Sequence, residues 1–280
     1  MLITSFQNPR VKYVRSLRLR KYRQRERRFL VEGIRIVEEA LEKGAPLETL
    51  VYAPDLLISE RAQALVERVE AGQRLALSGE VFRSLSDRDQ PQGIAAVVRI
   101  EERTLEELPL VEDLLLVVVH QLRDPGNLGS IIRTADGAGA TAVVVVEPSV
   151  DLYDPQTVRA TMGSLFALPI VRLEEEGMLG PWYGQVRASG LPLRVVATSA
   201  QGPQIYFDVD YQEPLVLLVG SERRGLPEHV RRQADAVVRL PMAGSATSLN
   251  VSAAAAALIY EVVRQRMAVT GARLKPGKET

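Results

Sequence analysis

The chain has 280 residues, of which 46% are hydrophobic and 25% charged, and its formal net charge is zero. This length allows one large or two ordinary domains, and the composition is typical of a globular protein. The zero net charge excludes a chain attracted as a whole to nucleic acid, and the absence of cysteine excludes disulfides and thiolate metal sites. Because there is neither a signal-like N-terminus nor an apolar stretch of membrane length, we expect a cytoplasmic protein without a membrane partner.

Positive charge gathers near the N-terminus, where Arg10 to Arg28 include ten Lys or Arg and a single acid, Glu26. Apolar residues recur between these cations at roughly helical spacing, which is typical of an amphipathic helix packed on its own domain. A dense group of cations is equally typical of an arm that contacts phosphates. The pattern leaves both interpretations open. The cations that would form such an arm are Arg10, Lys12, Arg18, Arg20 and Lys21.

Short strands and helices alternate through the first hundred residues, which predicts a small α/β domain over residues 1–105. Strands are predicted over 29–31, 47–52, 74–77 and 93–100, and helices over 34–43, 59–71 and 81–85. A charged stretch with a proline follows, and we interpret residues 106–112 as a linker.

A larger α/β domain is predicted over residues 113–270, followed by a flexible tail over 271–280. Its strands are predicted over 114–119, 142–146, 170–173, 193–198, 215–219 and 236–240. Apolar runs such as LLLVVV are typical of strands buried on both faces of a parallel sheet, so we expect helices on both faces. Helices are predicted over 128–138 and 155–164 and after Ser248, whereas the segment around Trp182 reads as a polar connection.

Three loops of this domain follow predicted strands, after Val119, Val219 and Leu240. Because parallel α/β sheets bind ligands at the carboxyl ends of their strands, the polar residues of these loops are candidate site residues. They are Asn127 and Arg133 in the first segment, Gly220, Ser221, Glu222 and Gly225 in the second, and Ser248 and Asn250 in the third. Asn127 and Ser248 are also predicted to cap the helices that follow them.

Several familiar sites are excluded. The run Gly137–Ala142 matches G-x-G-x-x-A, but it ends a helix and opens a strand, the reverse of the order that a dinucleotide site requires. The chain contains neither a phosphate-binding G-x-x-x-x-G-K-[ST] loop nor a G-x-S-x-G nucleophile elbow. Its two histidines, His120 and His229, lack the spacing of metal ligands, so we expect no metal site.

The three loop segments resemble, in order and spacing, the three motifs of the SpoU/TrmH branch of the SPOUT RNA methyltransferases. They read NLGSIIRTADGAGA, LVLLVGSERRGLPEHV and LPMAGSATSLNVSAAAAALIYEVVRQR. The segments RRFLVEG and QPQGIAAVV resemble, more weakly, the ribosomal-protein-like substrate-binding domain that precedes the catalytic domain in many members. One departure is Arg223, which stands where the family often has glycine.

The resemblance implies transfer of a methyl group from S-adenosyl-L-methionine to a ribose 2′-hydroxyl of RNA. It also implies a homodimer and a C-terminal trefoil knot, a topology that is nearly absent from proteins in general. The family's donor contacts fall on Thr198, Gly220, Leu240, Met242 and Leu249. Arg223 and Arg224 are expected to contact RNA, together with the N-terminal cations.

The catalytic roles that the resemblance implies fall on Arg133, Asn127, Glu222, Ser248 and Asn250. Arg133 matches the family's essential arginine. Because a guanidinium is almost always protonated, we favour a phosphate clamp over a general base, although the family has been given both roles. Asn127 is expected to orient Arg133 or the phosphate, and Glu222 to hold the second loop. Ser248 and Asn250 are expected to position the ribose.

The separate N-terminal domain favours ribosomal RNA, and 23S rRNA in particular, over transfer RNA. The other hypotheses are a tRNA ribose methyltransferase, a resistance-type methylase, and an RNA-binding or ribosome assembly factor without turnover. A small-molecule α/β enzyme is disfavoured by the basic arm and by the missing nucleotide fingerprints.

Overall fold

The computed structural model describes residues 1–270, and the predicted tail over 271–280 lies outside the described residues. The chain forms two compact units, each of which takes up two stretches of sequence. Unit 1 comprises Met1–Glu102 and Asp151–Ala167, and unit 2 comprises Arg103–Val150 and the described residues from Leu168 onward. The sequence analysis had placed residues 151–167 in the larger domain, whereas the structure places them in unit 1.

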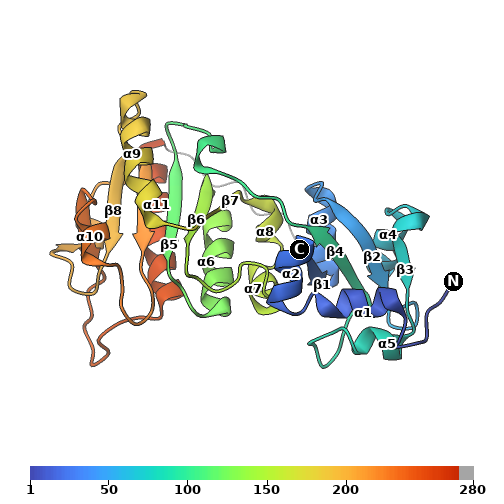
Figure 1. The fold of residues 1–280 in the computed structure, drawn as a ribbon. Coiled ribbons are helices and arrows are strands. Elements are labelled where there is room, and N and C mark those ends of the chain that lie inside the picture. The colour runs from blue at the N-terminus through green and yellow to red at the C-terminus, as the bar shows by residue number, and fades with distance from the viewer. Residues whose placement is uncertain (271–280) are drawn as a thin grey trace. The chain divides into compact units, whose positions relative to one another are not determined.

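Unit 1 is built on a four-stranded sheet (Figure 1). Its elements in chain order are α1 (Pro9–Ser16), α2 (Arg20–Glu26), β1 (Arg28–Glu32), α3 (Ile34–Glu42), β2 (Leu47–Tyr52), α4 (Glu60–Glu67), β3 (Arg74–Ala76), α5 (Gly79–Arg83), β4 (Ile94–Arg99), α7 (Pro155–Thr161) and α8 (Ser164–Ala167). The strand order is β1-β4-β2-β3; β4 is antiparallel to both neighbours, and β2 is parallel to β3. The predicted strands are therefore present.

The N-terminal basic segment forms two helices, and the first of them packs on the sheet. Val11 and Leu17 are fully buried in the core that also contains residues of α5. Burial of a side chain of this size contributes about 2 kcal/mol to stability. The interpretation of this segment as an amphipathic helix packed on its own domain is therefore correct for α1. The exposed cations of α1, Arg10 and Lys12, lie outside its buried face.

Asp151–Ala167 joins unit 1 through a buried ion pair and an aromatic cluster. Arg23 is 2% exposed, and its guanidinium donates from Nε and Nη2 to Oδ2 of Asp151 at 3.0 and 2.6 Å. The ring of Phe29 lies 4.7 Å from that of Tyr153 and 6.2 Å from that of Phe166, between centroids. Because these partners are more than a hundred residues apart, local sequence patterns did not reveal the pairing.

Unit 2 contains a seven-stranded sheet with the order β7-β6-β5-β10-β8-β11-β9, in which all paired strands are parallel (Figure 1). Its elements are β5 (Leu115–His120), α6 (Pro125–Gly137), β6 (Ala142–Val146), β7 (Ile170–Leu173), α9 (Leu179–Ala188), β8 (Arg194–Thr198), β9 (Gln204–Ile205), β10 (Leu215–Val219), α10 (Glu228–Arg231), β11 (Ala236–Arg239) and α11 (Val251–Thr270). All six predicted strands are present, and β9 is an additional edge strand.

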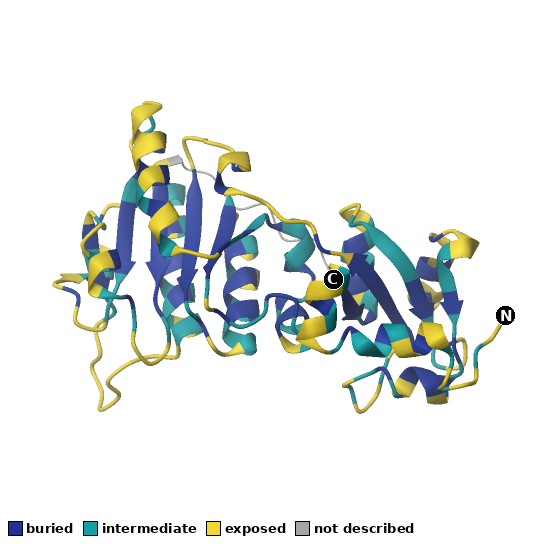
Figure 2. Cartoon of the chain, in the orientation of Figure 1, coloured by how far each residue is buried: buried dark blue, intermediate teal, exposed yellow. Residues whose placement is uncertain are grey.

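Helices cover both faces of this sheet, as predicted. Residues of α9 and α10 pack on one face, and the buried residues of α6 and α11 lie on the other. The strands β5, β6 and β10 in the middle of the sheet are accordingly buried along their whole length (Figure 2). The segment around Trp182 was wrongly interpreted as a polar connection: it is helix α9, which buries Trp182 and Tyr183 in the core.

The predicted linker over 106–112 also contributes to unit 2. A 3₁₀ turn at Leu105–Glu107 overlaps its start, and Leu105 and Leu108 are buried in the same core cluster as residues of α9. The start of the predicted linker is therefore packed in the core of unit 2.

Candidate active site

The three candidate loops lie at one edge of the sheet in unit 2. They leave the carboxyl ends of β5, β10 and β11, and β8 separates β10 from β11 in the strand order. Because all these strands are parallel, their carboxyl ends share that edge, and the end of β8 at Thr198 lies there as well. The polar residues of four successive strand ends are therefore neighbours.

The first loop is closed by Asp124, which caps α6. Its carboxylate accepts a hydrogen bond from the backbone N–H of Asn127 at 2.7 Å, and Pro125 occupies the first helical position. The prediction that Asn127 caps this helix was wrong. Because Asp124 takes that role, the side-chain amide of Asn127 is available for other partners.

Asn127 connects the second loop to the third. Its Nδ2 donates to Oε1 of Glu222 at 3.0 Å, and its Oδ1 accepts from Nδ2 of Asn250 at 2.9 Å. Glu222 also accepts from the backbone N–H groups of Arg123 and Asp124, each at 3.4 Å. These hydrogen-bonded side chains, here called the Asn–Glu–Asn network, link Asn250 to Glu222 through Asn127.

The other end of Asn250 caps α11. Its Oδ1 accepts from the backbone N–H of Ser252 at 2.9 Å and from the Ser252 hydroxyl at 2.6 Å. The cap predicted at Ser248 is therefore wrong by two residues. Since both ends of the Asn250 amide are engaged, its orientation is fixed by the helix on one side and by Asn127 on the other.

The network also sets the charge of Glu222. Burial raises the pKa of its carboxyl, but the hydrogen bonds from Asn127 and from nearby backbone amides outweigh burial and hold the pKa below its ordinary value. Glu222 is therefore an acceptor in the network, and it is ionised at neutral pH.

The second loop folds back on itself, and this requires glycine at Gly220. A Cβ there would lie 2.2 Å from the carbonyl carbon of Gly225 and 2.3 Å from the nitrogen of Leu226. The Gly225 N–H donates to the Ser221 carbonyl at 2.9 Å, and Gly225 has φ +61°, in the left-handed region that favours glycine. The close return of the backbone positions Glu222 at the tip of this turn.

A cavity of about 480 Å³ opens between the second and third loops, the segment that follows β8 and the first turns of α11. The five residues predicted to contact the donor all line it: Thr198, Gly220, Leu240, Met242 and Leu249. Glu222, Arg223, Arg224 and Ser248 line it too. The loop from Pro241 to Asn250 is exposed throughout, so this wall of the cavity faces solvent (Figure 2).

Arg133 is not brought together with the other predicted catalytic residues. It is exposed on α6 and does not line the cavity, and its guanidinium forms no hydrogen bond or ion pair with any residue in the described range. A Cβ at Gly137, one helical turn later, would lie 3.5 Å from the hydroxyl of Tyr260 on α11. The guanidinium thus belongs to an exposed face of α6 and α11.

The sequence analysis missed residues that follow β8, notably Ser199, as well as Arg231 of α10; both line the cavity. The position of Ser199 directly after a predicted strand was a usable signal, because that strand ends at the same edge.

The two histidines are partners of one carboxylate, which sequence spacing did not indicate. Nε2 of His120 and Nε2 of His229 each bond to one carboxylate oxygen of Glu176. Burial raises the pKa of Glu176, and the hydrogen bonds from the two imidazoles more than offset this, so the pKa lies below its ordinary value. In residues 1–270, no group of three or more His, Asp or Glu is arranged to hold a metal ion.

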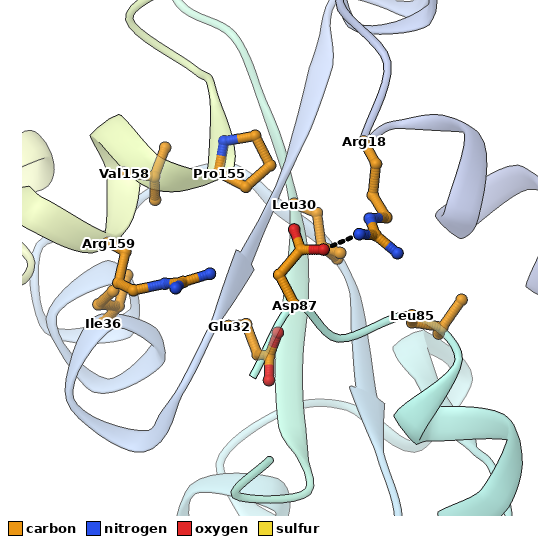
Figure 3. Close-up of a pocket in the computed structure, with 9 residues that line it drawn as sticks. All are labelled: Arg18, Leu30, Glu32, Ile36, Leu85, Asp87, Pro155, Val158 and Arg159. Atoms are coloured by element: carbon orange, nitrogen blue, oxygen red, sulfur yellow. Dashed lines mark ion pairs between the residues drawn. The ribbon is translucent and has the colours of Figure 1, made fainter. Parts of the chain in front are cut away.

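The cations of the predicted basic arm are of two kinds. Some form ion pairs within the fold, and others, here called the free cations, have no ion-pair partner among the described residues. Arg18 forms an ion pair with Asp87, and both line a small hollow together with residues of β1, α3 and α7 (Figure 3). Arg23 is buried against Asp151, as described above. Arg10, Lys12, Arg20 and Lys21 are exposed and have no ion-pair partner among the described residues.

Within the part of the chain that the structure describes, no helix has both the length and the hydropathy needed to cross a membrane.

Comparison with known proteins places this geometry in a family. The model of the SpoU rRNA methylase family matches residues 114–260, and that of the MRM3-like substrate-binding domain matches residues 8–96. A 23S rRNA (uridine(2479)-2′-O)-methyltransferase of Streptomyces viridochromogenes is 40% identical over 249 residues, which cover 89% of this chain and 86% of the relative. The 23S rRNA (guanosine(2553)-2′-O)-methyltransferase RlmP of Bacillus subtilis is 32% identical over 93% of this chain and 98% of its own length.

A solved structure shows the same fold with the donor bound. The SpoU methyltransferase AviRb from Streptomyces viridochromogenes, in complex with AdoMet, matches with a TM-score of 0.87 and 38% identity, covering 93% of this chain and 99% of that one. The family match spans more than half of the chain, and the relatives are similar over nearly its full length. The chain therefore belongs to the SpoU rRNA methylase family, and its cofactor is S-adenosylmethionine.

Proposed function

We propose that this protein transfers a methyl group from S-adenosylmethionine to a ribose 2′-hydroxyl of 23S ribosomal RNA. The observation that carries the proposal is the convergence of five separate residues, expected to contact the donor, on one cavity beside the Asn–Glu–Asn network. The names of the similar enzymes from Streptomyces viridochromogenes and Bacillus subtilis support the choice of ribose and of 23S rRNA.

The cavity suits a donor of this size and chemistry. Its volume of about 480 Å³ falls within the usual range for small-molecule sites, roughly 300–1,000 Å³. The small side chains of Ala254 and Ala255 form part of the wall, and the folded loop at Gly220 brings main-chain groups to it. In our proposal, Thr198, Gly220, Leu240, Met242 and Leu249 hold the donor mainly through their backbone.

The bound donor supplies a methyl group on a positively charged sulfur. The ribose oxygen forms a bond to the methyl carbon while the carbon–sulfur bond breaks and its electron pair stays on sulfur. The hydroxyl proton passes to solvent water during or before this step. Because the displacement is in line, the protein contributes chiefly by aligning the oxygen, the methyl carbon and the sulfur.

Arg133 acts on the RNA in this account. Its exposed guanidinium is placed to grip the phosphate next to the target ribose as a two-pronged donor. We favour this role over that of a general base, since a guanidinium rarely loses its proton. Asn127, Glu222 and Asn250 hold the loops in place, and Ser248, at the wall of the cavity, contacts the ribose.

The proposal includes a homodimer. Arg133 lies outside the cavity of its own chain, on a face that also carries Gly137 and Tyr260, and Tyr260 is 48% exposed. A second copy seated on this face covers the exposed ring and brings Arg133 towards the partner's cavity. A closed pair of this kind uses the same face of both chains.

Mixed dimers test this arrangement. Chains carrying R133A are combined with chains carrying G220V, a change whose side chain collides with the backbone of the second loop. If Arg133 acts on the partner's cavity, random association restores up to about a quarter of the wild-type activity, because one of two sites in the mixed dimer is complete. Absence of any restored activity in demonstrably mixed dimers would show that Arg133 acts within its own chain.

We propose that two separate sets of cations contact RNA: the four free cations of unit 1 and, in unit 2, Arg223 and Arg224 of the second loop. All six are exposed. Arg18 is left out, because its guanidinium is paired with Asp87. Exposed unpaired cations are available to displace counterions from phosphates, whereas paired ones are already neutralised.

Two further features complete the proposal. The family resemblance supports a C-terminal trefoil knot around the loops that form the cavity. We also propose a cytoplasmic location, because a bacterial-type ribosomal RNA substrate, as named for the similar enzymes, is found there.

Methylation of total RNA tests the function. The protein is incubated with labelled donor and total RNA that lacks the modification, and the 2′-O-methylated positions are mapped. We expect a single site in 23S rRNA. A methylated site in transfer RNA would show that the substrate is transfer RNA and that the reaction is the proposed one. RNA binding that needs no donor and gives no methylation would show that the protein is an RNA-binding factor and not an enzyme.

A further inference from the structure

The charges that line the cavity are unbalanced. Its charged lining residues are one acid, Glu222, and three arginines, Arg223, Arg224 and Arg231. Glu222 already accepts hydrogen bonds from Asn127 and from backbone amides. A positively charged sulfonium donor entering this cavity therefore needs its own anionic group to meet a cation of the wall.

Arg231 is the arginine of the lining that is held in a defined position. It ends α10 and is half-buried, while Arg223 and Arg224 are exposed on the loop. Its Nη1 donates to the hydroxyl of Ser199 at 3.4 Å. The Ser199 backbone is itself fixed, because its N–H donates to the Val238 carbonyl at 2.9 Å.

The charge of Arg231 is not neutralised by any carboxylate in residues 1–270. Its neighbour Arg232 differs in this respect, since it forms an ion pair with Glu228 and does not line the cavity. A half-buried, oriented guanidinium without a carboxylate partner, on the wall of a small-molecule cavity, is suited to bind an anion of the ligand.

We propose that Arg231, oriented by Ser199, binds the carboxylate of the methyl donor and so selects donors that carry an intact amino-acid end. The inference rests on the proposed placement of the donor in this cavity. A planar guanidinium matches the two oxygens of a carboxylate, and the Ser199 hydroxyl offers a further donor beside it. The adenosine end then occupies the part of the cavity away from α10.

Two product-like ligands separate the contribution of the carboxylate. S-adenosylhomocysteine has the carboxylate, and 5′-methylthioadenosine has the same nucleoside and thioether but lacks the amino-acid end. Calorimetry with wild type, R231M and R231K measures both affinities. R232M is the matched control, because it removes an adjacent cation that is outside the cavity. Thermal unfolding of each variant shows whether it is folded at the assay temperature.

We expect R231M to weaken S-adenosylhomocysteine binding about tenfold, the usual scale for one charged hydrogen-bonded contact at a partly exposed site. Its affinity for 5′-methylthioadenosine should equal that of wild type. R231K should recover part of the loss, S199A should show a smaller loss of the same selectivity, and R232M should show none.

Equal binding of S-adenosylhomocysteine to folded R231M and wild type would overturn the inference. If the KM for RNA rises instead, Arg231 holds an RNA phosphate. An equal loss for both ligands would mean that Arg231 supports the cavity wall without contacting the carboxylate. Failure of wild type to bind either ligand would instead reject the donor placement, so the two failures are distinguishable.

Discussion

The side-chain amide of Asn250 donates to the side-chain oxygen of Asn127 at 2.9 Å and thereby links the start of α11 to the first turn of α6. The two residues are 123 positions apart in the sequence. The same Asn250 oxygen caps α11, so one side chain both begins a helix and fixes the loop that carries Glu222, through Asn127.

Substitution of Asn250 separates these two roles. N250D keeps an oxygen for the helix cap but loses the donor to Asn127, so we expect an activity loss of tenfold or more with a free energy of unfolding near that of wild type. N250A also loses the cap and should cost about 1 kcal/mol of stability. S248A serves as the control for stability, because Ser248 does not cap the helix. Chemical denaturation and methyl-transfer assays measure both effects; equal stability loss in N250D and N250A would contradict the capping assignment.

The ionisation of Glu222 makes a pH-dependent contribution to stability. Its folded-state pKa is lowered by the bonds from Asn127 and the backbone, despite burial. A glutamate with a lowered folded pKa contributes stability above its unfolded pKa, about 4.3, and loses that contribution as the pH falls through the folded value. The difference in unfolding free energy between wild type and E222Q should therefore be constant from pH 7 to about 5.5 and shrink below about pH 4. A difference that grows on acidification would contradict the assigned network.

The Arg23–Asp151 ion pair should be a major stabilising contact of unit 1. Because the Arg23 side chain is buried, R23M leaves Asp151 without its partner and is expected to cost about 3 kcal/mol. A double-mutant cycle with D151N measures the coupling by denaturant unfolding. The matched control is R61M, which removes an exposed pair with Glu38 and should cost less than about 1 kcal/mol. Additive effects of R23M and D151N would show that the two side chains are not coupled.

The Asn127–Asn250 hydrogen bond and the Arg23–Asp151 ion pair show what could not be predicted from the sequence. The strands were predictable because they contain apolar runs such as Leu115–Val119, whose residues are all buried. The two helix caps were predicted at the wrong residues, because each helix start offers two equally good cap residues within three positions. These are Asp124 and Asn127 for α6, and Ser248 and Asn250 for α11, and only the structure selects between them. The site loops were found from strand ends, whereas the contact of Arg23 with Asp151 depends on packing between remote segments.

Helix α9 was missed for a related reason. Three consecutive glutamates precede it, and Gly180, Pro181 and Gly184 interrupt its pattern. Burial of Trp182 and Tyr183 in the sheet core supplies the stability that local helix propensity lacks. Likewise, the three motifs predict that Arg133 is a site residue, but its position outside the cavity follows only from the three-dimensional structure.

The free cations of unit 1 should control RNA affinity without affecting the donor. We replace Arg10, Lys12, Arg20 and Lys21 by glutamine, which should weaken RNA binding. The slope of log K against log salt concentration should become shallower by about 0.7–0.9 per lost phosphate contact. Donor affinity should be unchanged, because none of these residues lines the cavity. Point substitutions are preferable to deletion of residues 1–100, since deletion would expose Tyr153 and Phe166, which pack on Phe29. Unchanged RNA affinity and salt slope would remove this surface from the account.

The central claim is that the protein methylates a ribose hydroxyl with S-adenosylmethionine bound in the loop cavity, while Arg133 holds the phosphate next to that ribose. Transfer of labelled methyl from S-adenosylmethionine to 23S rRNA, followed by nuclease digestion and mass spectrometry, tests it most directly when wild type and R133A are compared alongside their donor affinities. We predict one 2′-O-methylated nucleoside with wild type, none with R133A, and donor affinities that agree within a few-fold. Methyl groups on a base, or undiminished transfer by R133A, would contradict the account.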